Sequence, residues 1–195
     1  DELIDGLING IKNFPVEYLT YGGWFGYDEC RKAIANRQNR IEKTSLNENN
    51  IILHNGSSGC LENILNAFIE HNDVVIVESP SYSGTVRCIQ GSLAEVIEIP
   101  IHSDGINSKE FKNLVENIKQ QNKKIKFFYT IPDYHNPTGN VAPIETRESI
   151  LRICAENKIL IIEDAAYSEL YFDEAPPPTY FSLSMGFGVL RMCSF

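Results

Sequence analysis

Three short runs of this sequence consist mainly of apolar residues: "DVVIVES" at 73–79, "IKFFYT" at 125–130 and "ILIIED" at 159–164. Strands with one face in solvent alternate apolar and polar residues, whereas strands covered on both faces do not. Segments with apolar residues at helical spacing alternate with these runs. The sequence therefore predicts an α/β fold of three layers, with a mostly parallel central sheet and helices on both faces.

The clearest helical segment is "SKEFKNLVENIKQQ" at 108–121, in which Phe111, Leu114, Val115 and Ile118 form one apolar stripe. Ser108 is a residue type that favours the N-cap position, and we expect the helix to begin there. The run "IILH" at 51–54 is expected to be a further strand that leads into a helix, and "GFGVLRMCS" at 186–194 to contain the last strand.

The composition and charge of the chain limit the kinds of partner and site that it can have. The net charge of −9 argues against a nucleic-acid partner, because phosphate recognition depends on clusters of Lys and Arg. The five cysteines are scattered and odd in number, which favours buried thiols in a reducing cytosol over disulfides or a metal site. The four histidines share no ligand spacing, so no metal site is expected, and no apolar run is long enough to span a membrane.

Chemistry-bearing residues follow the predicted strands, at the edge of a parallel sheet where ligands bind. In "HNGSSGC" at 54–60, the backbone N–H groups of Ser57 and Ser58 would start a helix and form a cup for an anion. The Gly-Lys-Ser/Thr ending of a P-loop is missing. An ordinary helix-capping turn explains the same residues, so both interpretations stay open at this point.

Two loops carry further candidates. Tyr82 follows the run at 73–79 and has two explanations, stacking on a flat cofactor ring or packing in a turn. In "IPDYHNPTGNV" at 131–141, Pro137 holds Asn136 out of the helical region, so that its amide can be directed at a ligand. The bond between them is a candidate for a cis peptide.

The fourth segment is "ILIIEDAAYSELYF", in which Asp164 ends a strand and Tyr167 follows three residues later. A carboxylate at the mouth of a parallel sheet needs a cationic partner, and a pyridinium N–H would be one. A helix N-cap formed by Asp164 is the alternative.

Together these segments resemble, in order and approximate spacing, the large domain of pyridoxal-phosphate (PLP) enzymes of fold type I, and specifically the class I/II aminotransferases. The resemblance extends from about Tyr21 to Phe195. It implies a lead-in segment at residues 1–20 and a partial PLP-binding domain at residues 21–195, without the family's C-terminal small domain.

The resemblance also implies roles around the cofactor ring. Asp164 would pair with the pyridine nitrogen, Asn136 and Tyr167 would hydrogen-bond the phenolic oxygen, and Tyr82 would stack on the ring. The cofactor is expected to be pyridoxal 5′-phosphate.

The phosphate would be held by other residues. The resemblance implies that Ser57 and Ser58 bind it through backbone N–H groups and that Ser194 adds a hydroxyl. Tyr21 would reach the phosphate of the neighbouring subunit, which implies a homodimer. By the family pattern the lysine that forms the Schiff base comes just after Phe195, so that no catalytic residue is expected within these 195 residues.

The reaction implied is transfer of an amino group from an amino acid to a 2-oxo acid, and this chain would be an inactive fragment of the enzyme. Related PLP-dependent lyases and synthases, such as aminocyclopropane-carboxylate synthase-like enzymes or C–S lyases, share the same motifs. A non-catalytic PLP-binding regulatory domain and a degenerate homologue are further alternatives. Donor specificity has no signal in this sequence.

Overall fold

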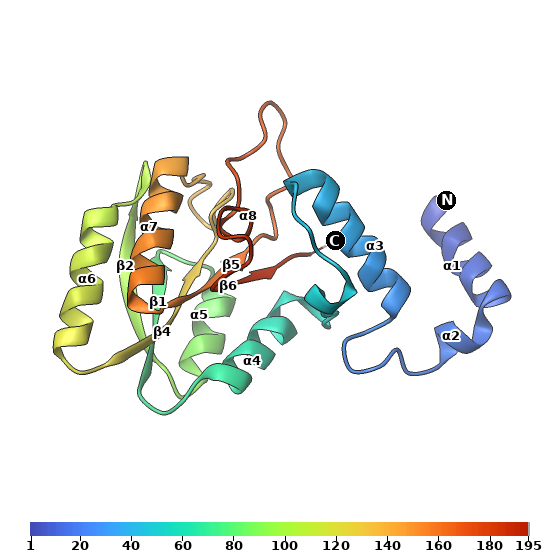
Figure 1. The fold of residues 1–195 in the computed structure, drawn as a ribbon, viewed down its shortest axis with the longest axis horizontal. Coiled ribbons are helices and arrows are strands. Elements are labelled where there is room, and N and C mark those ends of the chain that lie inside the picture. The colour runs from blue at the N-terminus through green and yellow to red at the C-terminus, as the bar shows by residue number, and fades with distance from the viewer. Residues whose placement is uncertain (195) are drawn as a thin grey trace. The chain divides into compact units, whose positions relative to one another are not determined.

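The computed structural model describes residues 1–194 and divides the chain into two compact units, one formed by Asp1–His54 and the other beginning at Asn55. Phe195, the last residue of the predicted domain, lies outside the described residues. The boundary expected after residue 20 stays a prediction. Figure 1 shows the elements of both units.

The first unit is helical. It contains α1 (Glu2–Asn13), α2 (Pro15–Leu19), α3 (Asp28–Glu42) and the short 3₁₀ helix η1 (Glu48–Asn50). The side chain of Arg31 on α3 ties this unit together, because it pairs with Asp28 and donates hydrogen bonds to the carbonyl oxygens of Glu48, at 2.6 Å, and Ile51, at 3.4 Å.

The second unit is built on a sheet that has six strands within the described residues. They are β1 (Asp73–Ser79), β2 (Glu95–His102), β3 (Gly105–Ile106), β4 (Lys124–Thr130), β5 (Leu160–Asp164) and β6 (Val189–Met192), in the order β3-β2-β1-β4-β5-β6. Only the β2–β3 pair is antiparallel. The mostly parallel sheet expected from the sequence is therefore confirmed.

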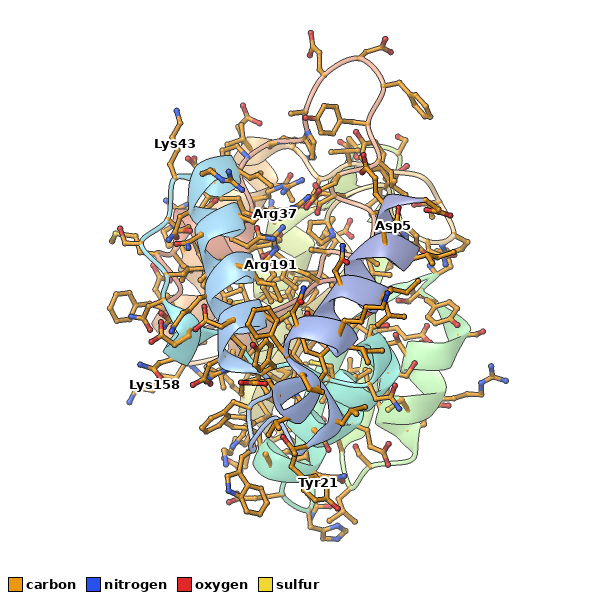
Figure 2. The ribbon with its side chains drawn as sticks, turned by 90° about the vertical axis from the view of Figure 1, so that its right-hand side faces the viewer. Asp5, Tyr21, Arg37, Lys43, Lys158 and Arg191 are labelled. Atoms are coloured by element: carbon orange, nitrogen blue, oxygen red, sulfur yellow. The ribbon has the colours of Figure 1, made fainter. Side chains whose placement is uncertain are left out.

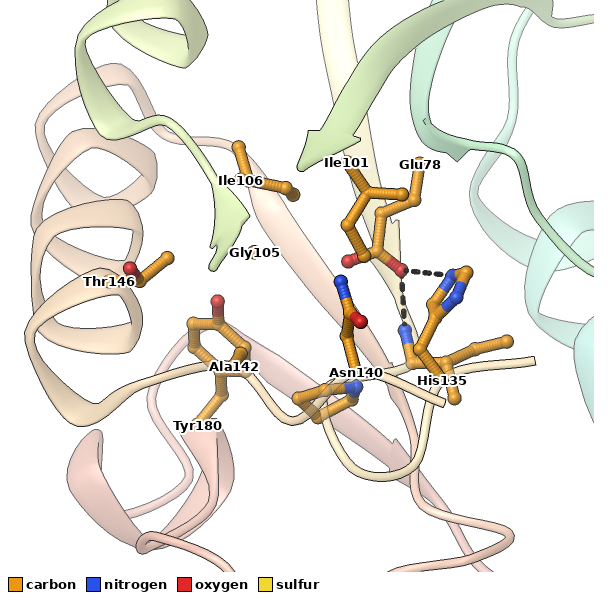
Figure 3. A pocket seen from close by; sticks show the side chains of 11 residues that line it. Glu78, Ile101, Gly105, Ile106, His135, Asn140, Ala142, Thr146 and Tyr180 are labelled. Carbon is orange, nitrogen blue, oxygen red and sulfur yellow. Dashed lines mark hydrogen bonds and ion pairs between the residues drawn. The ribbon is translucent and has the colours of Figure 1, made fainter. Parts of the chain in front are cut away.

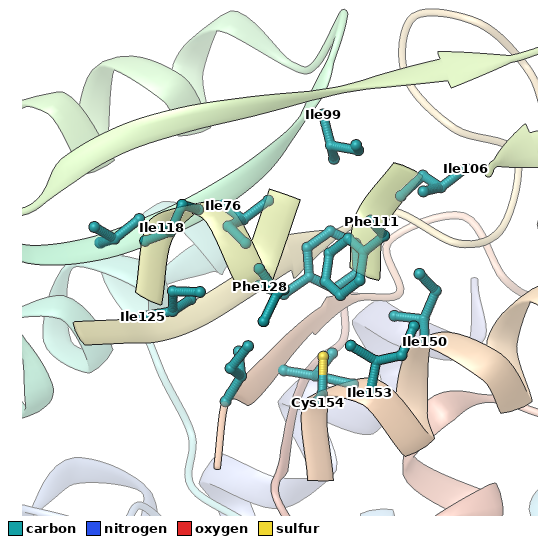
Figure 4. Close-up of a cluster of buried hydrophobic side chains, with 14 of the residues drawn as sticks. Ile76, Ile99, Ile106, Phe111, Ile118, Ile125, Phe128, Ile150, Ile153 and Cys154 are labelled. Atoms are coloured by element: carbon teal, nitrogen blue, oxygen red, sulfur yellow. The ribbon is translucent and has the colours of Figure 1, made fainter. Parts of the chain in front are cut away.

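Helices lie on both faces of this sheet (Figure 1). These are α4 (Gly56–Phe68), α5 (Ser83–Gln90), α6 (Ser108–Gln120), α7 (Ile144–Asn157) and α8 (Tyr180–Leu183). Alternate residues of β1 enter different cores: Val74 and Ile76 pack with the residues of α6 and α7, whereas Val75 and Val77 pack with those of α4 and α5. Figure 4 shows the first of these cores, which explains why the central strands are apolar throughout.

The strand order reverses between β1 and β4, because β2 follows β1 toward one edge of the sheet and β5 follows β4 toward the other. At such a switch point the loops that leave the two neighbouring strands diverge and leave room for a ligand. The loops here carry Tyr82, after β1, and Asn136, after β4.

Two local predictions are wrong. Residues 51–54 form no strand; within the described residues no strand pairs with them, and a strand needs such a partner for its backbone groups. The helix α6 begins at Ser108 as expected, but its N-cap is Asn107 rather than Ser108, since the Asn107 side chain accepts hydrogen bonds from the backbone N–H groups of Lys109 and Glu110. Asn is as good a cap as Ser, so residue type alone did not distinguish them.

The end of the sheet at which β4 and β5 begin is rich in lysine. An open groove there is lined by Lys119, Lys123, Lys124, Lys126 and Lys158. Acidic side chains balance much of this charge: Lys123 pairs with Glu95 at 2.7 Å, and Lys124 pairs with Glu70 at 3.0 Å. Over residues 1–194, no helix combines the length and the apolar character needed to cross a membrane.

Candidate functional site

The carboxyl ends of β5 and β6 and the first turns of α4 and α5 surround one pocket. The residues that line it come from segments up to 135 positions apart in the chain: Ser57, Ser58, Leu61, Tyr82, Gly84, Thr85, Cys88, Asp164 and Met192. Four of the predicted site residues, namely Ser57, Ser58, Tyr82 and Asp164, are therefore brought together.

Asp164 is one of the residues that line this pocket, and it is 9% exposed. Its Oδ2 accepts a hydrogen bond from the hydroxyl of Tyr129 on β4 at 2.6 Å. Its Oδ1 is buried and, among the described residues, has no hydrogen-bond partner. Burial raises the pKa of this carboxyl, while hydrogen bonds from Tyr129 and from the backbone N–H of Ala166 oppose the shift. An acceptor of this kind costs free energy until a donor enters the pocket.

Tyr82 is the N-cap residue of α5, and its ring lies over the first turn of that helix. A Cβ added at Gly84 would stand 2.6 Å from a carbon of the ring, so a glycine is required there for the ring to take this position. The tyrosine is 48% exposed. It can therefore offer a ring face to a flat ligand.

Ser57 and Ser58 belong to the first turn of α4. The turn begins at Gly56, whose φ of +76° suits glycine, and the N-cap residue Asn55 makes no side-chain capping hydrogen bond. The first turn also carries no acidic residue. A capping side chain from Asn55 and an acidic residue in the first turn, either of which would oppose an anion here, are thus both missing from this helix start, and anion binding by Ser57 and Ser58 stays a prediction.

Asn136 and Tyr167 come together from different loops, because the amide nitrogen of Asn136 donates a hydrogen bond to the Tyr167 hydroxyl at 3.3 Å. The peptide bond between Asn136 and Pro137 is cis. The two side chains are not among those that line the pocket around Asp164. The structure therefore brings Asn136 and Tyr167 into contact with each other but does not place them in the lining of the pocket around Asp164.

Buried polar groups hold the loop that carries this amide (Figure 3). Glu78, at the end of β1, accepts hydrogen bonds from the Thr130 hydroxyl at 2.8 Å and from the Ile131 backbone N–H at 2.9 Å. Its Oε2 also lies 3.2 Å from Nε2 of His135, whose Nδ1 lies 3.0 Å from the Thr138 hydroxyl. These contacts connect the ends of β1 and β4 on either side of the switch point.

A second buried pair fixes the same loop from α7. Arg147 is fully buried and forms an ion pair with Asp133 at 2.5 Å. Its guanidinium also donates hydrogen bonds to the carbonyl oxygens of Pro132, at 3.2 Å, and Ala142, at 2.9 Å. The loop is thus bonded to the rest of the unit on both sides of Asn136.

Ser194, like Asn136 and Tyr167, is not among the residues that line the pocket; it follows β6 and is exposed. Tyr21 belongs to the first unit, where its side chain is fully exposed (Figure 2). Their predicted contacts with the phosphate stay predictions.

Sequence reasoning missed Tyr129, which hydrogen-bonds Asp164, and Thr85, which contacts the Tyr129 hydroxyl and lines the pocket. One signal was available for the tyrosine, because a phenolic hydroxyl on a strand covered on both faces needs a buried partner. No comparable signal marked Thr85, since threonine in the first turn of a helix is common.

The comparisons with known proteins agree with this geometry. The family described as aminotransferase class I and II matches residues 15–195. The chain is 26% identical over 166 residues to aromatic-amino-acid aminotransferase 1 of Thermococcus litoralis, covering 85% of this chain and 40% of that protein. It is 29% identical over 180 residues to 2-aminoadipate transaminase of Thermus thermophilus, covering 91% and 43%.

Among solved structures, LysN, an α-aminoadipate aminotransferase of Thermus thermophilus complexed with N-(5′-phosphopyridoxyl)-L-leucine, superimposes with a TM-score of 0.86 at 26% identity. The match covers all of this chain and 48% of LysN. The chain thus spans somewhat less than half the length of the proteins that it resembles.

Proposed function

Because the chain belongs to the class I and II aminotransferases, we propose that the whole protein transfers an amino group from an amino acid to a 2-oxo acid. The cofactor is pyridoxal 5′-phosphate, in keeping with the family and with the phosphopyridoxyl group bound to LysN. In such enzymes the bound cofactor acts as an electron sink for the substrate carbon.

One observation carries this proposal: Asp164 lines the pocket, and its buried Oδ1 has no hydrogen-bond partner among residues 1–194. The N–H of a protonated pyridine ring supplies both the missing donor and a positive charge. An ionised carboxylate paired with that N–H keeps the ring nitrogen protonated. The residues of the pocket therefore fit the cofactor.

The remaining groups hold the other sides of the cofactor in this proposal. Tyr82 covers one ring face and excludes water from it. Asn136 and Tyr167 donate hydrogen bonds to the phenolic oxygen. The backbone N–H groups at Ser57 and Ser58 bind the phosphate, where the dipole of α4 favours negative charge.

Three roles lie beyond the pocket. Ser194 adds a hydroxyl to the phosphate site, and Tyr21 reaches the phosphate of the partner subunit in a homodimer. The lysine that bonds the cofactor is proposed to come after Phe195 in the protein. The five cysteines are free, in keeping with a cytoplasmic protein, although Cys154 alone is buried and the expectation of buried thiols is wrong for the exposed Cys30 and Cys193.

The test is a titration of the protein with PLP, followed by the change in cofactor absorbance, for the unmodified chain and for Asp164→Asn. Asparagine keeps the size of the side chain and removes its charge, so we expect affinity to fall by about 10- to 100-fold. Asp104→Asn, an exposed position between β2 and β3, is the matched control and should leave affinity unchanged.

Equal affinity of the Asp164→Asn variant and the unmodified chain would contradict the proposed site. The reaction is tested on the whole protein by following 2-oxo acid formation from an amino acid in the presence of a second 2-oxo acid. Release of ammonia or of a thiol without amino transfer would favour a lyase of the same family. PLP binding without turnover of any amino acid would favour a regulatory domain.

A further inference from the structure

The Asp164 carboxylate is the last member of a short chain of hydrogen bonds that also contains two buried hydroxyl groups. The Thr85 hydroxyl of α5 lies 3.0 Å from the Tyr129 hydroxyl of β4, which lies 2.6 Å from Oδ2 of Asp164 at the end of β5. All three side chains are at most 9% exposed, and Tyr129 is fully buried. Three separate elements thus contribute to one line of hydrogen bonds.

Which hydroxyl donates in each of these hydrogen bonds follows from the chemistry of the Asp164 carboxylate. An ionised carboxylate only accepts, so the Tyr129 hydroxyl donates to Asp164. Because the Tyr129 hydroxyl already donates its hydrogen to Asp164, its oxygen accepts a hydrogen bond from the Thr85 hydroxyl. Burial and the neighbouring Asp164 charge raise the pKa of Tyr129, so the phenol remains a donor.

This arrangement makes the two carboxylate oxygens unequal. Oδ2 accepts the hydrogen bond from Tyr129, whereas Oδ1 is buried and, among the described residues, has no partner. Asp164 as a residue lines the pocket. Removing the phenolic hydroxyl would leave both oxygens without a side-chain donor. The carboxylate would keep the hydrogen bond from the backbone N–H of Ala166 but lose the contact that the Tyr129 side chain makes with Oδ2, and its negative charge would be less stabilised.

We propose that Tyr129, supported by Thr85, is a positioning residue that holds the Asp164 carboxylate with Oδ1 facing the cofactor ring and stabilises its negative charge. The inference rests on the proposed function, because it gives the free oxygen the pyridine nitrogen as its partner. Tyr129 does not line the pocket, so it acts through Asp164 and has no contact of its own with the ring.

The experiment measures the protonation of the ring nitrogen directly. The protein is saturated with PLP labelled with ¹⁵N at the ring, and the ¹⁵N chemical shift, which differs strongly between protonated and neutral pyridine, is followed against pH. Tyr129→Phe removes only the hydroxyl. We expect the ring nitrogen to lose its proton about one pH unit lower than in the unmodified protein, and PLP affinity to fall by about tenfold.

Two further variants complete the test. Thr85→Val keeps the shape of the side chain and is expected to move the titration in the same direction by a smaller amount. Tyr180→Phe is the matched control, because Tyr180 is also fully buried but packs in the core on the other face of the sheet. It should leave the nitrogen titration unchanged whatever it does to thermal stability.

The outcomes separate the possibilities. If Tyr129→Phe binds PLP and titrates as the unmodified protein does, the inference is wrong and Tyr129 is only a core residue. If Tyr129→Phe does not fold, an unchanged titration in Thr85→Val overturns the inference and a shifted one supports it. If the unmodified protein shows no saturable PLP binding, the proposed function itself fails.

Discussion

Glu163 and Asp164 are neighbours in the chain, yet they enter different environments, because successive strand residues point to opposite faces of a sheet. Asp164 faces the pocket, whereas Glu163 accepts hydrogen bonds from the backbone N–H groups of Tyr180, at 2.8 Å, and Phe181, at 3.1 Å, at the start of α8. Two adjacent carboxylates therefore serve different purposes, one available to a ligand and one closing a loop.

Burial raises the pKa of Glu163 from 4.5 to about 7, which predicts a dependence of stability on pH. A raised pKa means that the folded state holds the proton more tightly. The stabilisation is therefore complete below pH 4.5 and is lost as pH rises through about 7. We expect the free energy of unfolding to fall by about 3 kcal/mol across this window, measured by urea denaturation at several pH values.

The variant Glu163→Gln isolates this group. Its free energy of unfolding should vary less between pH 4.5 and pH 8 than that of the unmodified chain, because glutamine does not titrate. If both chains show the same slope against pH, Glu163 is not the group responsible.

At the scale of the elements, the loop that carries Asn136 is held by the ion pair Asp133–Arg147 and by the contact between Glu78 and His135. The Asp133–Arg147 pair is buried, so removal of one member leaves an uncompensated charge inside the protein. The position of this loop thus depends on residues in β1 and α7 as much as on its own prolines.

Replacement of Arg147 tests this dependence. Arg147→Ala should lower the free energy of unfolding by about 3–5 kcal/mol, measured by urea denaturation, because Asp133 and several carbonyl oxygens lose their donor. Arg152→Ala, an exposed arginine on the same helix, should change it by less than about 0.5 kcal/mol. A similar small effect for both variants would show that the pair does not hold the loop.

The start of α6 offers a second test at this scale. Asn107→Ala removes the acceptor for the N–H groups of Lys109 and Glu110 and should cost about 1 kcal/mol of unfolding free energy. Ser108→Ala should cost little, since the structure assigns the cap to its neighbour. The reverse order of the two effects would restore the prediction made from the sequence.

The elements that the sequence predicted well are those with a strong local pattern, such as the apolar strands β1, β4 and β5 and the amphipathic helix α6. The expected strand at 51–54 failed because its formation depends on a pairing partner, which a local pattern does not reveal. Asp164 and Tyr82 were recognisable because each follows a strand end. Tyr129 and Thr85 were missed because their importance lies in contacts between segments 44 and 35 residues apart in sequence.

At the scale of the whole molecule, a net charge of −9 is unevenly distributed. Lysines gather at the amino ends of β4 and β5, while none of the described residues that line the pocket at the carboxyl ends is a lysine or an arginine. The site thus lies at the carboxyl ends of the parallel strands, and the lysine-rich groove lies at their amino ends.

This separation predicts how the 195-residue chain binds its cofactor. We expect PLP to be removed by dialysis, and treatment with borohydride followed by mass spectrometry to find no stoichiometric adduct on a lysine. Surface lysines react weakly with any aldehyde, so Asp164→Asn serves as the background. A stoichiometric adduct that disappears in Asp164→Asn would show that one of the present lysines reaches the site.

The first turn of α4 presents N–H groups where many phosphate sites present lysine or arginine side chains. The end of a helix acts as about half of a unit positive charge, so added ions have a weaker attraction to screen there than at a lysine or arginine side chain. The affinity of this chain for a phosphorylated ligand should therefore change little between low and high ionic strength. Its preference over the unphosphorylated aldehyde then comes from the fit of the phosphate oxygens to the helix end.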